Sequence, residues 1–150
     1  MVTTLILTHG ELAHELLSAA EVILGRVPPF YAVALDWGDS VEEATRKTRE
    51  ALSALDSAGG ILILTDMYGG TPYNVAVGFR EPGRVEVVTG VNLPMVVRLG
   101  CPGAPNEDLV KLAGWIQDKG RASISRAPAA GSKQRDRRRP VRSGDREEAT

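Results

Sequence analysis

The chain has 150 residues, a formal net charge of −1 and 43% hydrophobic residues, values typical of one soluble globular domain long enough to bury a core. Residues 1–127 carry 15 acidic and 11 basic side chains, a balance that argues against a nucleic-acid-binding domain. Residues 128–150 carry 7 basic and 4 acidic side chains and almost no aliphatic ones. We therefore predict a folded domain at 1–127 and a disordered basic tail at 128–150.

The cellular compartment is indicated by what the chain lacks. Its one cysteine, Cys101, excludes an internal disulfide, as expected in a reducing compartment. No signal peptide is recognisable at the start, and no apolar run approaches the roughly 18 residues that a membrane span requires. We therefore expect a cytoplasmic protein.

Short aliphatic runs alternate along the chain with segments of helical periodicity. In chain order, the predicted elements are a strand at Thr4–Thr8, a helix at Glu11–Leu24, a strand at Tyr31–Leu35, a helix at Ser40–Leu55, a strand at Ile61–Thr65, a helix at Thr71–Phe79, a strand at Val85–Thr89, helices at Leu93–Leu99 and Asn106–Lys119, and an edge strand at Arg121–Ser125. Glycines and prolines separate these elements, as they do in compact α/β proteins.

Several predicted helices begin with a recognisable cap. Ser40 followed by Glu43 is the pattern of a capping box. Thr71 is expected to cap the third helix, with Pro72 in the first helical position, and Asn106 is expected to cap the last one. These signals favour helices at the positions that the periodicity indicates.

The alternation of strands and helices predicts an α/β fold, doubly wound, with a mostly parallel sheet and helices on both faces. In such sheets ligands bind beyond the carboxyl ends of the strands, where the strand order reverses. Three unusual segments follow predicted strands: 8-THG-10, 66-DMYGGT-71 and 90-GVN-92. We expect all three at one edge of the sheet.

His9 is the candidate nucleophile at this edge. A histidine at the end of a strand is often only a structural residue, but Asp66 follows the third strand and provides a partner if strands one and three are neighbours. A carboxylate that accepts a hydrogen bond from one ring nitrogen fixes the tautomer and leaves the other nitrogen free to attack. It also stabilises positive charge that develops on the ring.

Gly69 and Gly70 precede the predicted helix at Thr71. The pair is consistent with a tight turn, and equally with backbone N–H groups that approach an anion at a helix N-terminus. The hydroxyl of Thr71 is available either to cap the helix or to donate to that anion. Together, a nucleophilic His9, an orienting Asp66 and an anion-binding segment at Gly69–Thr71 predict transient phosphorylation of an imidazole nitrogen.

Other classes of site find little support. The chain has no Walker loop, no G-x-G-x-x-G after a strand and no G-x-S-x-G elbow, so we expect no nucleotide cofactor and no serine nucleophile. No metal is expected, because His9 and His14 are five residues apart and would not share a helix face. We interpret Cys101 as a spectator thiol, and Trp37 and Trp115 as packing residues.

Three motifs in combination resemble one family. The segments 8-THG-10, 66-DMYGGTPYN-74 and 89-TGVNLPM-95 are similar to those of the IIA domain of the mannose-type (mannose/fructose/sorbose) sugar phosphotransferase system. The resemblance covers about residues 1–127. It implies four parallel strands, one antiparallel strand at Arg121–Ser125 and a homodimer in which that strand is exchanged between subunits.

The resemblance also implies an activity, that of a histidine phosphocarrier. His9 would take phosphate from the carrier protein HPr and pass it to a separate IIB protein, which serves membrane permease components. Asp66 would orient His9, the segment Gly69–Thr71 would line the phosphoryl site, and Asn92 would lie at its rim. Family members commonly have serine where Thr71 stands, so the hydroxyl is kept.

Alternatives remain at this point. One is a regulatory module whose phosphorylation state another protein reads, without transport. Another is the related phosphotransfer subunit of dihydroxyacetone kinases, against which the GGTP and GVNLPM segments argue. The simplest is an α/β protein that binds a small anion without catalysis. The transported sugar is not encoded here, because sugar contacts belong to membrane components.

Overall fold

The structure is a computed structural model that describes residues 1–128. Its elements, in chain order, are β1 (Thr3–His9), α1 (Leu12–Leu24), β2 (Phe30–Leu35), α2 (Val41–Ser53), β3 (Ile61–Thr65), α3 (Thr71–Gly78), β4 (Val85–Thr89), α4 (Leu93–Leu99) and α5 (Leu109–Ala122). The alternation predicted from the sequence is confirmed for the first eight of these elements, most within one or two residues at each end.

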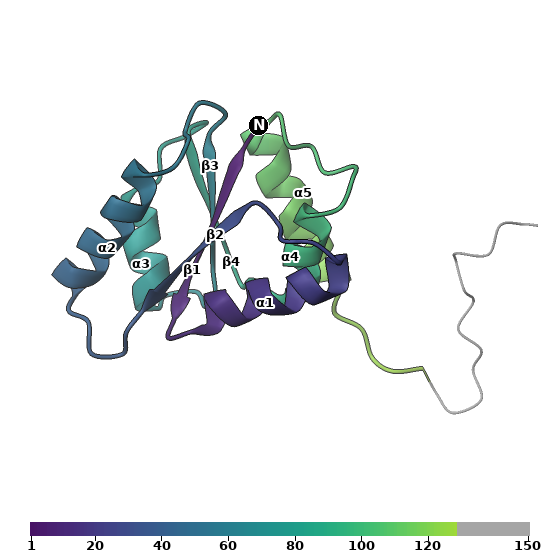
Figure 1. Cartoon of the computed structure of the whole chain (residues 1–150), viewed down its shortest axis with the longest axis horizontal. Coiled ribbons are helices and arrows are strands. Elements are labelled where there is room, and N and C mark those ends of the chain that lie inside the picture. The colour runs from purple at the N-terminus through teal and green to yellow at the C-terminus, as the bar shows by residue number, and fades with distance from the viewer. Residues whose placement is uncertain (129–150) are drawn as a thin grey trace, which may run out of the picture.

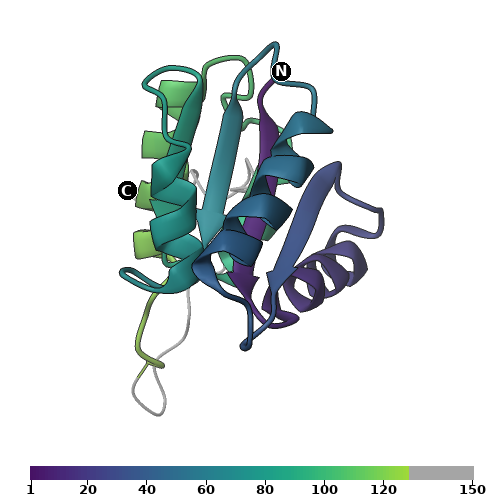
Figure 2. The same cartoon turned by 90° about the vertical axis from the view of Figure 1, so that its left-hand side faces the viewer.

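The four strands form one parallel sheet in the order β2-β1-β3-β4. Helices α2 and α3 cover one face, and α1, α4 and α5 cover the other (Figure 1). Figure 2 shows the strand arrowheads together at one edge of the sheet, so the loops that follow the strands meet there. The α/β fold with helices on both faces is therefore confirmed.

The sheet has a buried hydrophobic cluster on each face. All five residues of β3 are buried, as expected of a central parallel strand that is covered twice. One cluster joins Ile6 and Leu62 to α4 and α5, and the other joins Leu7 and Ile63 to α2 and α3. Alternate residues of the same strands thus support the two helical layers.

Of the predicted starts of α2 and α5, one is confirmed and the other differs. The capping box at Ser40 and Glu43 is confirmed, with the Glu43 N–H donating to Ser40 Oγ at 3.1 Å. Helix α5, in contrast, is capped by Asp108 and not by Asn106, whose carbonyl accepts a hydrogen bond from the Val2 N–H instead. The side chain of Asp108 accepts from the Lys111 N–H at 3.1 Å, so an equally good cap lies two residues further on.

The predicted end of the last helix at Lys119, directly before Gly120, is wrong. Helix α5 continues through Gly120 to Ala122, so the edge strand predicted at Arg121–Ser125 is not present in the single chain, and residues 123–128 form no strand there. A Cβ at Gly120 would lie 2.6 Å from Met95 Sδ, so the glycine lets α5 pack closely against α4. Close packing offsets its low helix propensity, which costs about 1 kcal/mol relative to alanine.

Two further predictions concern the C-terminal tail and the absence of a membrane-spanning helix. Apart from Pro128, the predicted basic tail lies outside the described residues. Within residues 1–128, none of the helices combines the length and the apolarity that crossing a bilayer would require.

Candidate functional site

The site lies where the strand order reverses. From β1 the chain moves outward to β2, whereas β3 and β4 lie on the opposite side of β1, so the reversal falls between β1 and β3. His9 is the last residue of β1, and Asp66 directly follows β3. The topology therefore brings together the two residues that the sequence proposed as a pair, at the position where open α/β sheets bind ligands.

His9 and Asp66 are joined by two hydrogen bonds. The ring atom Nδ1 of His9 lies 2.8 Å from Oδ2 of Asp66, and the backbone N–H of His9 donates to the same oxygen at 3.1 Å. Both side chains are mostly buried, with 23% and 12% of their surface exposed. With Nδ1 bound to the carboxylate, the nitrogen that remains for chemistry is Nε2.

Gly70 borders the imidazole closely. A Cβ built on Gly70 would lie 2.7 Å from Cε1 and 3.2 Å from Nε2 of His9, so no larger residue fits without moving the ring. The backbone of Gly70 is extended, with φ −76°, a conformation open to any residue. Glycine is required at position 70 only because the imidazole of His9 lies so close. Gly69, with φ +77°, is the member of the pair that needs left-handed backbone.

Thr71 is not the cap of α3, contrary to prediction. Gly70 occupies the N-cap position, Thr71 is the first helical residue, and no side chain caps the helix. A capping side chain at residue 70 would collide with His9, which explains its absence. The N–H groups of Thr71 and Tyr73 are thus left without a side-chain acceptor in a helix that starts directly after Gly70, the residue that borders Nε2 of His9; Pro72 has no N–H.

Trp37 is the residue that sequence analysis missed. We interpreted it as a packing residue, yet it is 82% exposed and its ring stacks on His9, with centroids 5.0 Å apart and planes inclined by 17°. It follows β2, whose carboxyl end lies beside that of β1. Its position after a strand was the signal that could have identified it.

Asn92 has contacts other than those expected. Its Oδ1 accepts from the Met95 N–H at 3.0 Å and caps α4, while Nδ2 donates to Ser123 Oγ at 3.2 Å. The hydrogen bonds of its side chain therefore connect α4 with the end of α5, and none of them reaches His9 or Gly70. A place for Asn92 at the rim of a phosphoryl site stays a prediction.

The remaining candidates do not join the site. His14 lies on the surface of α1, 3.2 Å from Glu11, and Cys101 is a free thiol in the loop after α4. In the part of the chain that the structure describes, no three His, Cys, Asp or Glu side chains are grouped as metal ligands.

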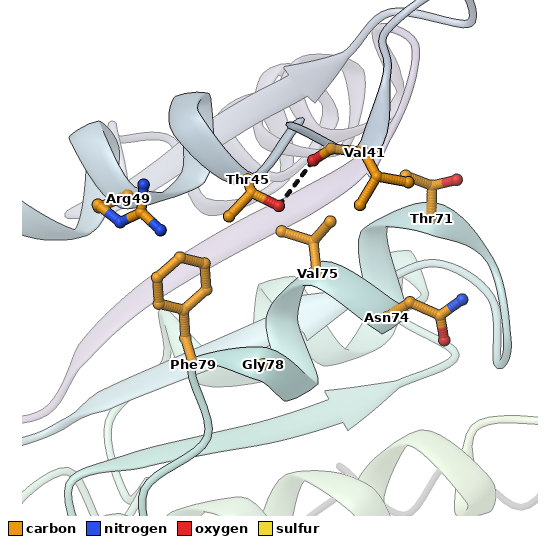
Figure 3. Close-up of a pocket in the computed structure, with 8 residues that line it drawn as sticks. All are labelled: Val41, Thr45, Arg49, Thr71, Asn74, Val75, Gly78 and Phe79. Carbon is orange, nitrogen blue, oxygen red and sulfur yellow. Dashed lines mark hydrogen bonds between the residues drawn. The ribbon is translucent and has the colours of Figure 1, made fainter. Parts of the chain in front are cut away.

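A groove of about 230 Å³ lies between α2 and α3. Figure 3 shows Thr71 and Asn74 at one end of it and Arg49 and Phe79 at the other, with the Thr45 hydroxyl turned toward the Val41 carbonyl. The guanidinium of Arg49 lies 5.8 Å from the ring centroid of Phe79. Neither His9 nor Asp66 lines this groove, but Thr71 does, so the groove borders the site at that end.

The arrangement is suited to nucleophilic attack on an anion. Asp66 holds Nδ1, Trp37 covers one face of the ring, and Gly70 leaves room beside Nε2. Uncapped N–H groups at the start of α3 lie next to the position where negative charge would arrive. A nucleophile, its orienting group and an anion site are the three parts that covalent group transfer needs.

Comparisons with known proteins agree with this geometry. Residues 3–101 match the family described as "PTS system fructose IIA component". The chain is 31% identical over 100 residues to the fructose-specific EIIA component of Bacillus subtilis, covering 66% of this chain and 68% of that protein. It is 36% identical over 91 residues to the mannose-specific EIIAB component of Escherichia coli, covering 60% of this chain but 28% of that relative.

A solved structure is similar over most of its length. The mannose/sorbose-specific IIA subunit from Enterococcus faecalis superimposes with a TM-score of 0.77 at 25% identity, covering 87% of this chain and 98% of that one. The component EIIA from Streptococcus agalactiae, at 23% identity and a TM-score of 0.73, shares the fold.

Proposed function

Because the chain belongs to the family of mannose/fructose/sorbose-type IIA components of the sugar phosphotransferase system, we propose that His9 is its phosphorylated residue. His9 takes a phosphoryl group from the phosphohistidine of HPr and passes it to a IIB protein, which serves sugar uptake. The observation that carries this proposal is the 2.8 Å pair of His9 Nδ1 and Asp66 Oδ2 at the reversal of strand order.

The transfer requires no net change in protonation. The lone pair of His9 Nε2 forms a bond to phosphorus, the P–N bond of the donor breaks, and its electron pair stays on the donor nitrogen. The donor ring, protonated at its other nitrogen, leaves as neutral imidazole. The ring of His9, which keeps its proton on Nδ1, becomes cationic.

Asp66 is proposed to orient the ring and to stabilise this cation. Its Oδ2 accepts from both N–H groups of His9, so ring and backbone are held to the same oxygen. The carboxylate is mostly buried, which strengthens its interaction with a positive ring. The charge therefore develops at the place where a fixed negative charge is already present.

Gly69, Gly70 and Thr71 are proposed to hold the phosphoryl oxygens, with the backbone N–H groups of the first turn of α3 as donors. The closeness of Gly70 to Nε2 and the missing cap of α3 support this assignment. The Thr71 hydroxyl has no capping role to compete with donation to the phosphoryl group.

We further propose a homodimer that involves the segment after α5. Strand β4 is at an edge of the sheet, and Ile124 in that segment is 80% exposed beside Val88 and Thr89. An open strand edge and a neighbouring apolar side chain favour pairing with a second copy. Residues 123–128, and not Arg121 or Ala122, are then the part that pairs.

The test is phosphorylation with Enzyme I, HPr and phosphoenolpyruvate. We expect acid-labile phosphate on the wild-type chain, none on His9→Ala, and full labelling of the matched variant His14→Ala, whose imidazole is on the exposed surface of α1. Mapping of the phosphate by mass spectrometry identifies the residue. Labelling that persists in His9→Ala, or that is lost in His14→Ala, contradicts the assignment.

A further inference from the structure

Trp37 combines high exposure with a defined position. A large aromatic side chain that is 82% exposed contributes little to the core, so burial does not explain its placement. Its ring nevertheless lies nearly parallel to that of His9, 5.0 Å from it. This separation is within the range in which aromatic rings attract one another and in which a cation above an indole is stabilised.

The backbone below Trp37 is adapted to it. Gly10 has φ +51°, and a Cβ at this position would lie 3.2 Å from Nε1 of Trp37. The N–H of Gly10 donates to the Leu35 carbonyl at 2.8 Å, which joins the loop after β1 to the end of β2. The indole therefore rests on the segment 9–10, where a side chain on residue 10 would crowd it.

The loop that carries Trp37 is held on both sides of it. Lys47 Nζ lies 3.1 Å from Asp36 Oδ2 and 2.6 Å from Asp39 Oδ2, and Asp39 Oδ2 also accepts from the Asp36 N–H at 3.0 Å. The Asp39 N–H donates to the Asp36 carbonyl at 3.0 Å, which closes the turn. These contacts hold the residues on both sides of Trp37, whose ring stacks on His9.

We propose that Trp37 is a positioning residue for the phosphorylated form of His9. By stacking, it holds the imidazole plane between Asp66 and Gly70, and its π face stabilises the cationic ring that exists while the phosphoryl group is on Nε2. This inference rests on the proposed function, because it concerns phosphohistidine. Beside Asp66 and Gly70, Trp37 is then a third residue that acts on the imidazole of His9, through an aromatic face and not through a charge.

The two contacts on the ring are complementary. Asp66 binds the edge of the ring at Nδ1 and offsets its charge, whereas Trp37 covers a face and excludes water from it. A neutral imidazole gains less from an indole face than a cationic ring does. Trp37 therefore favours the phosphorylated state over the free one and lengthens its lifetime against hydrolysis.

The experiment uses phosphoramidate as the phosphate donor, so that it does not depend on HPr. The full chain carries His14→Ala, which leaves His9 as its one histidine. Decay of phosphohistidine is followed by phosphorus NMR in this parent and with Trp37→Phe, Trp37→Ala or Tyr31→Ala added. Tyr31 is the matched control, an exposed aromatic residue at the other end of β2.

We expect Trp37→Ala to shorten the phosphohistidine lifetime about two- to fivefold, the factor that corresponds to an exposed cation–π contact. Trp37→Phe is expected to have an intermediate lifetime, and Tyr31→Ala that of the parent. In the free protein, the carbon-bound ring protons of His9 are expected upfield because of the indole ring current, and Trp37→Ala removes that shift.

Equal lifetimes in the parent and Trp37→Ala, or unchanged His9 proton shifts, overturn the inference. Failure of phosphoramidate to label His9 in the parent, while free histidine reacts, overturns it together with the choice of His9 as nucleophile. Failure of HPr to transfer phosphate, with the lifetime order as expected, overturns the proposed function and leaves the role of Trp37 standing.

Discussion

At the scale of single residues, Gly70 decides how much space the imidazole of His9 has. Its backbone dihedrals are accessible to any residue, so local conformation does not require glycine there. The requirement comes from His9, whose Cε1 would lie 2.7 Å from an added Cβ. The two neighbouring glycines therefore have different requirements. Gly70 is needed because of its contact with His9, and Gly69 is needed because its backbone has φ +77°.

We predict that Gly70→Ala lowers the rate of phosphate incorporation by about tenfold or more, because the ring must move from the position set by Asp66. The fold should be kept, since the loop backbone accommodates alanine. Gly78→Ala in α3 is the matched control, because a Cβ there meets nothing within 4 Å. A rate for Gly70→Ala equal to that of Gly78→Ala would show that the ring has more freedom than the contact indicates.

At the scale of elements, the loop between β2 and α2 is held by three charges. The hydrogen bond from Lys47 lowers the pKa of the Asp39 carboxyl from its ordinary value of 3.8, and the same bond raises the pKa of Lys47 above 10.5. The stabilisation is therefore fully present between these two values. It is lost as the pH falls through the lowered pKa of Asp39, or rises through the raised pKa of Lys47.

We predict that Lys47→Met moves Trp37 away from His9, seen as loss of the upfield shift of the His9 ring protons near neutral pH. Its urea midpoint should be lower than that of the wild type by an amount that shrinks as the pH falls below 3.8. Arg46→Met removes an exposed ion pair with Glu50 in the same helix and should leave the His9 shift unchanged. A pH-independent difference in midpoint for Lys47→Met would show that its charge is not what holds the loop.

At the scale of the whole molecule, the sheet ends in two edge strands, β2 and β4, and β4 is the one near the segment after α5. Strand β4 is flanked on its outer side by no strand among residues 1–128, and all five of its residues are only partly buried. The segment after α5 begins beside this edge, where Asn92 Nδ2 donates to Ser123 Oγ. A second copy of the chain could satisfy the free backbone groups of β4.

We predict that a chain ending after Ala122 sediments as a monomer or aggregates, whereas a chain ending after Pro128 remains a dimer at micromolar concentration. The physical reason is that residues 123–128 contain Ile124 and the backbone groups proposed to pair with β4. Ser123→Ala in the full-length chain is the control, because it removes the bond to Asn92 and keeps the segment. A full-length protein that sediments as a monomer contradicts the proposed dimer.

Much of the fold could be predicted because its signals are local. The strands Ile61–Thr65 and Val85–Thr89 and the capping box at Ser40 are encoded by neighbouring residues, and the structure confirms them. For these features, the order of residues along the chain already determined the outcome. The pair of His9 and Asp66 required more, because parallel strands end on the same side of a sheet but the first and third strands also had to be neighbours, as the strand order shows they are.

The rest was decided by contacts between segments far apart in the chain. From its neighbours in the sequence, Gly120 is typical of a helix end. The helix α5 nevertheless continues through it, because a residue without a side chain lets α5 approach Met95 of α4 closely. Trp37 reads as a packing residue until β2 pairs with β1 and brings its loop over His9. Local interactions determine whether a segment forms a helix or a strand. Which side chain fits at a contact between two elements depends on their close packing, and that packing is known only from the tertiary structure.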